Sequence, residues 1–131
     1  MRIIDASSLA KYVNHEKGWK NIESYLIEGC VTLDLAVKEV LNSIWKRYLR
    51  SEFKIEQAQN IMFEFLNNIP VKTIAQNKYL ADAIKISLKY KITIYDSLYL
   101  ALAIREGLEL ITSDEKQYKV AISENLKTIL A

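Results

Sequence analysis

The chain has 131 residues, of which 50% are hydrophobic and 26% charged, and its formal net charge is +2. This composition is typical of a globular protein, and we expect residues 1–131 to form one domain with a substantial core. Three Gly and one Pro exclude a flexible linker. So small a net charge does not by itself indicate nucleic-acid binding, and any such binding must use a local patch.

Cysteine content and hydropathy bear on the compartment. The single cysteine, Cys30, excludes an intrachain disulfide and fits a reducing environment. The chain does not open with a basic region followed by a long apolar stretch, as a signal peptide would. The longest apolar run, residues 98–104, is too short to cross a bilayer. We therefore expect a soluble, cytoplasmic protein without membrane contact.

The spacing of apolar residues predicts short strands that alternate with helices. Gly29 and Gly107 favour helix ends, and Asp34 favours a helix start. In chain order we expect a strand at 1–4, a helix from residue 7 or 8, a helix at 18–28, a strand at 31–33, a helix at 35–50, a helix from 51 to at least 66, a strand or edge segment at 71–74, helices at 78–90 and 95–106, a strand at 108–113 and a short strand ending the 123–130 tail.

Connection lengths indicate the fold class. Short strands joined by long helical segments cannot form hairpins and require crossovers. The sequence therefore predicts an α/β fold, with a parallel sheet covered by helices on both faces. In such sheets the ligand site lies beyond the carboxyl ends of the strands.

Four acidic residues lie in four separate segments: Asp5, Glu39, Asp96 and Asp114. Asp5 ends the apolar start of the chain, Asp114 ends the apolar run at 108–113, and Asp96 opens a helix that is apolar on every side. A buried carboxylate costs several kcal/mol unless it is paired or holds a metal. Carboxylates brought together by the fold repel one another, and a hard divalent cation is the natural remedy. This pattern suggests a metal-dependent enzyme.

Each acid also has a structural interpretation. Asp is a favoured helix cap, so Asp5 and Asp96 fit caps, and Asp114 fits a turn residue or a cap. Glu39 lies opposite the apolar stripe of its helix, so a solvated surface position fits it equally well. The four acids together are more informative than any one of them.

Four sequence motifs carry a resemblance to a known family. They are residues 3–8 (IIDASS), 36–42 (AVKEVLN), 93–103 (TIYDSLYLALA) and 110–114 (LITSD). In this order and spacing they resemble the motifs of PIN domains, particularly the VapC-type toxin ribonucleases. The resemblance covers nearly the whole chain.

The resemblance implies a three-layer α/β/α PIN-like domain with a short-stranded central parallel sheet, and metal-dependent endoribonuclease activity on single-stranded or structured RNA. The implied partners are a cognate antitoxin protein and a second copy in a homodimer. The implied catalytic and metal-binding residues are the four acids, with supporting hydroxyls from Ser7 and Thr112. Many relatives carry a further acid after the fourth motif, whereas Lys116 and Gln117 follow Glu115 in this chain. The number of bound metal ions, one or two, is therefore left open.

Ligand chemistry and charge suggest how such a protein would act. Hard oxygen ligands select Mg²⁺ or Mn²⁺, which would activate water to attack the phosphodiester and leave 5′-phosphate and 3′-hydroxyl ends. The lone histidine, His15, excludes a ribonuclease that uses paired imidazoles. RNA also needs cationic contacts, for which the candidates are Lys46, Arg50 and Lys11. A solvated helix face is the alternative for each of them.

Two other classes of function remain open. One is a catalytically silent PIN-fold binding module, which sequence does not separate from an enzyme. The other is a receiver-like phosphoacceptor domain, but the pair of adjacent acids that receivers carry after the first strand is missing. A phosphatase of the haloacid-dehalogenase type would need an aspartate at position 7, where this chain has Ser7.

Overall fold

The computed structural model describes residues 1–131 as five short strands, seven α-helices and one 3₁₀ helix. The elements are β1 (Arg2–Ile4), α1 (Ala6–Val13), α2 (Trp19–Glu28), β2 (Cys30–Leu33), α3 (Leu35–Leu49), α4 (Ile55–Asn67), β3 (Lys72–Ile74), η1 (Asn77–Tyr79), α5 (Leu80–Tyr90), α6 (Ile94–Glu106), β4 (Leu110–Thr112), α7 (Glu115–Ser123) and β5 (Thr128–Leu130).

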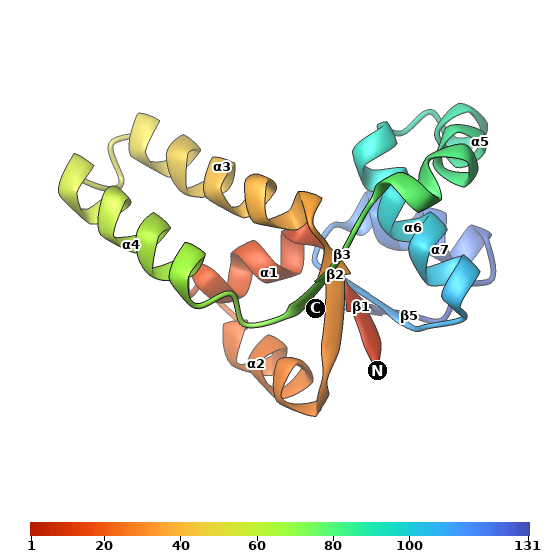
Figure 1. Ribbon diagram of the computed structural model, residues 1–131, viewed down its shortest axis with the longest axis horizontal. Helices are drawn as coiled ribbons and strands as arrows, with labels where there is room; N and C mark the ends of the chain where they lie inside the picture. Colours follow the sequence, from red (N-terminus) through yellow and green to blue (C-terminus); the bar gives the residue numbers. More distant parts are fainter.

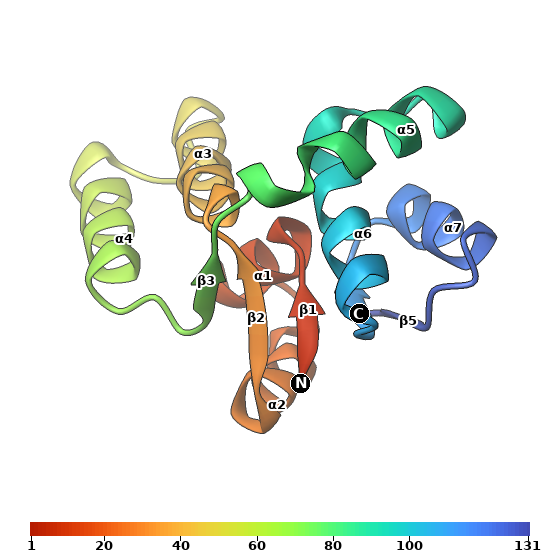
Figure 2. The same ribbon diagram turned by 45° about the vertical axis from the view of Figure 1, so that its right-hand side comes forward.

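The strands form one parallel sheet in the order β3-β2-β1-β4-β5. The central strand β1 pairs with β2 on one side and with β4 on the other, so Ile3 lies opposite both Val31 and Leu110. Helices α1 to α4 lie on one side of the sheet, and α5 to α7 lie on the other (Figures 1 and 2). The predicted three-layer α/β/α fold is confirmed.

The core lies between the sheet and its helices, and α6 is its most deeply buried helix. Residues 97–103 of α6 are all buried because the helix packs against β1 and β4 on one side and α5 on another. Gly107 ends α6 in the left-handed conformation (φ 65°), which glycine adopts without strain. No helix of the fold combines the length and the apolar character that a membrane crossing requires.

Several element boundaries differ from the sequence prediction. Helix α4 begins at Ile55 rather than Ser51, because Ser51 turns the chain with a positive φ of 61°. Strand β4 covers only Leu110–Thr112. Asp34 precedes α3 but makes no capping hydrogen bond with its side chain. Helix α7 was not predicted from the sequence.

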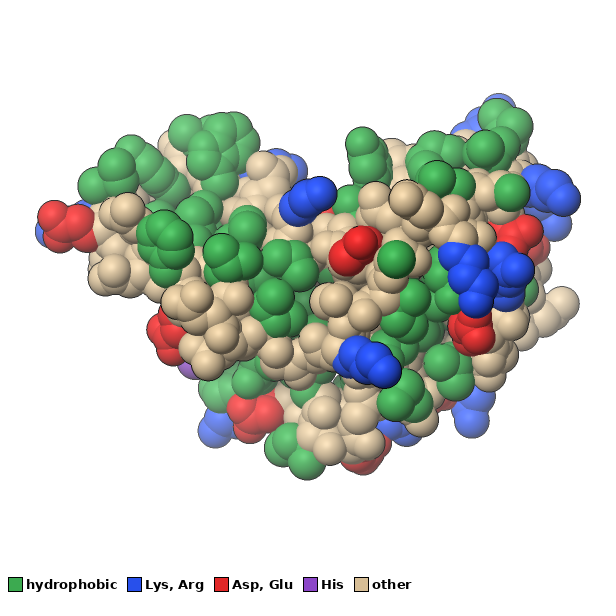
Figure 3. Space-filling view, viewed as in Figure 1, with side chains coloured by type: hydrophobic (Ala, Val, Ile, Leu, Met, Phe, Trp, Pro, Cys, Tyr) green, Lys and Arg blue, Asp and Glu red, His purple; other side chains and the backbone are tan.

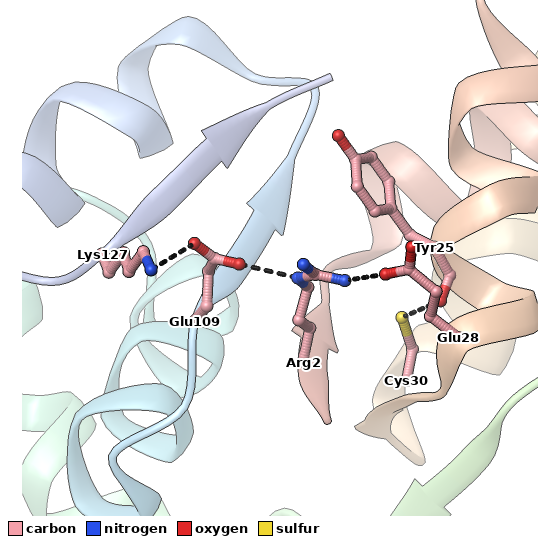
Figure 4. A network of polar contacts seen from close by, with 6 residues as sticks. All are labelled: Arg2, Tyr25, Glu28, Cys30, Glu109 and Lys127. Carbon is pink, nitrogen blue, oxygen red and sulfur yellow. Dashed lines mark hydrogen bonds and ion pairs between the residues drawn. The ribbon is translucent and has the colours of Figure 1, made fainter.

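The amino ends of the strands carry a network of paired charges (Figure 4). The Arg2 guanidinium lies between Glu109, at 2.6 Å, and Glu28 at the end of α2. Lys127 lies 3.9 Å from the same Glu109 carboxylate. These residues begin β1, end α2 and precede β4 and β5, so the network joins four elements at the edge where the strands start.

The burial of α6 generates a stability prediction. Replacing the fully buried Leu100 by Ala should lower the free energy of unfolding by about 2–5 kcal/mol, because it leaves a cavity in the core. The matched change Leu88→Ala removes the same atoms from a side chain that is 76% exposed, and should cost less than about 0.5 kcal/mol. Urea unfolding measures both values, and equal losses would contradict the assigned burial of α6.

Candidate active site

The sheet topology creates a crevice beside β1 and β4. The connection from β1 leads to β2 on one side, whereas the connection from β4 leads to β5 on the other. Ligand sites of open α/β sheets lie at such switch points, beyond the carboxyl ends of the strands. Asp5 directly follows β1, and Asp114 follows β4 after one intervening residue. The backbone N–H of Asp5 donates to the carbonyl of Ile111 at 3.1 Å, which fixes the two strand ends side by side.

The four acids all line one cavity of about 190 Å³. The same cavity is lined by Ala6, Ser7, Ala10, Ser43 and Tyr99, and by no lysine, arginine or histidine. The molecular surface is notched between the α3–α4 side and the α5–α6 side (Figure 3). The fold therefore brings together carboxylates from four segments of the chain without a basic side chain in the wall.

Asp5 is almost fully buried and also caps α1. Its side-chain Oδ1 accepts hydrogen bonds from the Ser8 backbone N–H at 3.1 Å and from the Ser7 hydroxyl at 2.6 Å. Both bonds use Oδ1, so the cap does not occupy Oδ2. The structural and functional interpretations of this aspartate are therefore compatible.

Ser7 and Thr112 link the acids at the two strand ends. The Ser7 and Thr112 hydroxyls lie 3.3 Å apart, and Ser7 Oγ also accepts the backbone N–H of Ser113 at 2.9 Å. Thr112 is fully buried, and its hydroxyl accepts the backbone N–H of Asp114 at 3.1 Å. The hydroxyl network thereby ties the first turn of α1 to β4 and the loop that follows it.

Asp114 and Asp96 both stand at the start of a helix, but in different positions. Asp114 is the N-cap of α7, and its Oδ1 accepts the backbone N–H of Lys116 at 2.9 Å. Asp96 is not a cap, because Thr93 caps α6 and its hydroxyl accepts the Asp96 backbone N–H at 3.1 Å. The capping interpretation of Asp96 is therefore wrong, and its half-buried carboxylate faces the cavity instead.

Glu39 is half-buried and does not lie on a solvated surface. Its Oε1 accepts a hydrogen bond of 2.8 Å from the hydroxyl of Tyr99, a residue of α6 that is 1% exposed. The solvated-surface interpretation of Glu39 is therefore wrong. The apolar stripe of α3 faces the core, and Glu39 faces α6 instead, where Tyr99 lies. The apolar pattern of α3 shows which of its residues face the core, but it does not show that α6 lies beside Glu39.

Burial and mutual repulsion set the charge state of the site. Burial raises the pKa of Asp5 to about 6, and the nearby Asp96 carboxylate adds to the rise. Burial also raises the pKa of Glu39, as do the charges of Asp96 and Asp5. The pKa of Asp96 is raised by burial and then by Asp114, against the lowering effect of the Lys116 charge. Ionised carboxylates are thus destabilised in this cavity.

The donor set fits a hard divalent cation. All four candidate ligands are carboxylates, which suit Mg²⁺ and Mn²⁺ rather than zinc. No three of the chain's Asp, Glu, His or Cys side chains are close enough to form a complete ligand cluster as they stand. This arrangement suits Mg²⁺, which keeps several waters and binds through one or two carboxylates and substrate phosphates.

The cationic RNA-binding candidates lie outside the cavity. Lys46 is exposed on α3, and Arg50 is engaged by Glu52 at 2.8 Å. Lys11 is half-buried and extends toward Gly18 at the start of α2. None of the three lines the acidic cavity.

The chain belongs to the PIN-domain family, whose model matches residues 2–123. It is 33% identical over 119 residues to Ribonuclease VapC3 of Pyrobaculum aerophilum, and this match covers 87% of this chain and 89% of that protein.

Two solved structures have a similar fold. The crystal structure of PAE2754 from Pyrobaculum aerophilum aligns with a TM-score of 0.70 at 23% identity, over 91% of this chain and 78% of that one. A toxin–antitoxin complex from Klebsiella pneumoniae aligns with a TM-score of 0.62 at 19% identity, over 90% of each chain. At these identities the two structures support the fold alone.

Three residues whose hydrogen bonds hold the acids or their surroundings in place were not predicted from the sequence: Tyr99, Ser113 and Gln117. Tyr99 holds Glu39, the Ser113 hydroxyl lies 2.8 Å from that of Ser8, and Gln117 donates to the Asp96 carbonyl. A polar residue within the apolar face of a predicted helix is the signal that identifies such contacts. Only Gln117 gives this signal, and it was hidden because α7 was not predicted.

The raised pKa of Asp5 predicts how stability depends on pH without metal. Its ordinary value of 3.8 becomes about 6 in the folded chain. The folded state therefore binds more protons between these values, and stability falls as pH rises through the window. Asp5→Asn should raise the free energy of unfolding at neutral pH, by at most about 3 kcal/mol.

Unfolding in EDTA across the acidic to neutral range measures this effect. The advantage of Asp5→Asn over the wild type should shrink as pH falls from about 6 to about 4, where the wild-type carboxyl is protonated. Asn retains an oxygen for the α1 cap, so loss of the cap does not mask the result. A variant less stable than the wild type at neutral pH would show that Asp5 is a stabilising ion.

Proposed function

We propose that this protein is a metal-dependent endoribonuclease and the toxin of a toxin–antitoxin pair. The observation that carries this proposal is the convergence of four carboxylates from separate segments in one cavity at the switch point of the sheet. Membership of the PIN-domain family supports it, as does the similarity to a protein named Ribonuclease VapC3.

The four acids are the residues proposed to bind Mg²⁺ or Mn²⁺ and to form the catalytic site. Such an ion, when bound, supplies an activated water and offsets the charge of the scissile phosphate. With no basic residue in the cavity wall, the carboxylates alone would repel the RNA backbone. The number of ions, one or two, depends on how many carboxylates each ion takes.

The chain's own residues orient the carboxylates before substrate binds. The Ser7 hydroxyl holds Oδ1 of Asp5, and the Tyr99 hydroxyl holds Oε1 of Glu39. Thr112 holds the backbone of Asp114. Oxygens fixed in this way need little reorganisation during the reaction, which is the main way a protein lowers a barrier that involves charge.

The absence of an imidazole at the site favours attack by water over attack by the ribose 2′-hydroxyl. The only histidine, His15, stacks on Trp19 with ring centres 4.2 Å apart and does not line the cavity. If water attacks the phosphorus and the 3′-oxygen leaves, the P–O3′ bond breaks and the products carry 5′-phosphate and 3′-hydroxyl ends. RNA beyond the scissile bond would contact cations around the cavity, for which Lys46, Arg50, Lys11 and the neighbouring Lys116 are candidates.

The proposed protein partners are an antitoxin and a second copy of the chain. Helices α3 and α4 enclose an apolar groove of about 480 Å³, and hydrophobic side chains gather on this part of the surface (Figure 3). Trp45, Ile55 and Phe63 line it and are each about half exposed or more. An exposed apolar surface of this kind is typical of a protein contact.

A catalytically silent binding module is the alternative function. Both functions predict the same fold and the same acidic cavity, and only a measurement of turnover separates them.

Asp96→Asn tests the proposed activity. With Mn²⁺ present, it should reduce cleavage of mixed single-stranded and transfer RNAs by at least about 100-fold, because several kcal/mol of charge stabilisation depend on the metal ligands. Gel analysis of labelled RNA measures the rate, and EDTA should abolish wild-type cleavage.

Asp82→Asn is the matched control, because Asp82 also lies in the first turn of a helix, α5, but outside the acidic cavity. It should cleave at the wild-type rate. Full activity of the wild type in EDTA would exclude the metal mechanism. A wild type without turnover under any divalent ion would favour the silent module.

A further inference from the structure

Gln117 is a buried polar residue on the core-facing side of α7. It is 2% exposed and shares its helix face with Val120 and Ala121, which are also buried. Its side-chain Nε2 donates a hydrogen bond of 2.8 Å to the backbone carbonyl of Asp96. Its Oε1 is buried and has no hydrogen-bond partner.

Stability alone does not explain an amide in this position. A buried carbonyl oxygen without a partner costs free energy, whereas an apolar side chain of similar length would fill the same space without that cost. The one hydrogen bond that the side chain makes goes to a residue of the acidic cavity.

Gln117 contacts two of the four acids through different groups. While its side chain holds the carbonyl of Asp96, its backbone N–H points to Oδ1 of Asp114 at 3.5 Å. The side-chain bond is the only hydrogen bond between α6 and α7. A single residue therefore connects the first turns of the two helices that carry Asp96 and Asp114.

This connection works against a repulsive force. Asp96 and Asp114 repel each other through their charges, and the fold holds them on separate elements. The hydrogen bond from Gln117 to the Asp96 carbonyl opposes this repulsion where α6 and α7 begin. Gln117 does not line the cavity itself, so it affects the acids only through its hydrogen bonds on the side away from the cavity.

We propose that Gln117 is a positioning residue that sets the separation of Asp96 and Asp114 for a divalent cation shared between them. This inference rests on the proposed metal-dependent function and adds to it a specific residue outside the ligand set. Groups that orient metal ligands in this manner change metal affinity by about 10–100-fold when they are removed.

The test compares Gln117→Met with Gln76→Met. Methionine keeps the length and flexibility of glutamine but donates no hydrogen bond. Gln76 is the matched control, because its Oε1 is also buried without a partner, while its side chain makes no hydrogen bond and lies outside the acidic cavity. Gln117→Leu provides a second apolar variant if the first folds poorly.

Two measurements separate positioning from stability. Mn²⁺ binding, followed by the electron paramagnetic resonance signal of free Mn²⁺, should weaken about 10-fold in Gln117→Met and remain unchanged in Gln76→Met. The melting temperature in EDTA should be unchanged or higher in Gln117→Met, because a buried amide oxygen without a partner has been removed. RNA cleavage at low Mn²⁺ should fall by a similar factor and recover as Mn²⁺ is raised.

Three outcomes would overturn the proposal. If Gln117→Met binds Mn²⁺ as tightly as the wild type, Gln117 does not position the acids. If both apolar variants melt at a lower temperature in EDTA without weaker Mn²⁺ binding, or do not fold, its role is structural. If the wild type neither binds Mn²⁺ nor cleaves RNA, the proposed function itself is wrong and this inference falls with it.

Discussion

The structure depends on holding four carboxylates together where the strands of a parallel sheet end. Burial together with mutual repulsion raises the pKa values of Asp5, Glu39 and Asp96, so the ionised forms of these three would be more stable in water. The rest of the molecule supplies the force that keeps them there. Strands β1 and β4 are paired in the middle of the sheet, and α6 is buried along residues 97–103, so the acids cannot separate without disrupting the core.

Acidic residues are paired with cations at the amino ends of the strands but not at the carboxyl ends. At the amino edge, Arg2 lies between Glu28 and Glu109, so each carboxylate there has a cationic partner. At the carboxyl ends of the strands, no lysine or arginine lines the cavity, and the carboxylate oxygens accept hydrogen bonds only from hydroxyls and backbone N–H groups. The ion pairs of Glu28 and Glu109 with Arg2 show that this fold can place a cationic side chain beside its acids. The unpaired state at the other edge therefore suggests a positive partner that the polypeptide does not provide.

Short-range patterns in the sequence were sufficient to predict the fold class and to point Asp5, Asp96 and Asp114 toward one place, whereas Glu39 was added to them only by the family resemblance. Apolar runs that end in Asp5 and Asp114 place these residues at strand ends, and long connections force parallel pairing. Helix α7 was missed because its nine residues are mostly polar and carry a weak apolar pattern, and its fold is stabilised by packing against β4 and β5. The contacts of Glu39 and Asp96 depend on how α6 packs beside α3 and α7. The residue pattern of one helix does not reveal this packing.

Capping and ligand binding are often treated as competing explanations for an aspartate at a helix start, but this site combines them. A cap needs one carboxylate oxygen, and both Asp5 and Asp114 use only Oδ1 for it. The cap fixes the side-chain rotamer, because backbone N–H groups of the first turn hold that oxygen in place. Fixing one oxygen also fixes the direction of the second. An aspartate at a helix start that closely follows a strand is therefore rigid, with one carboxylate oxygen used by the cap and the other not used by it. Two such aspartates, Asp5 and Asp114, lie at one switch point of the sheet and line the same cavity.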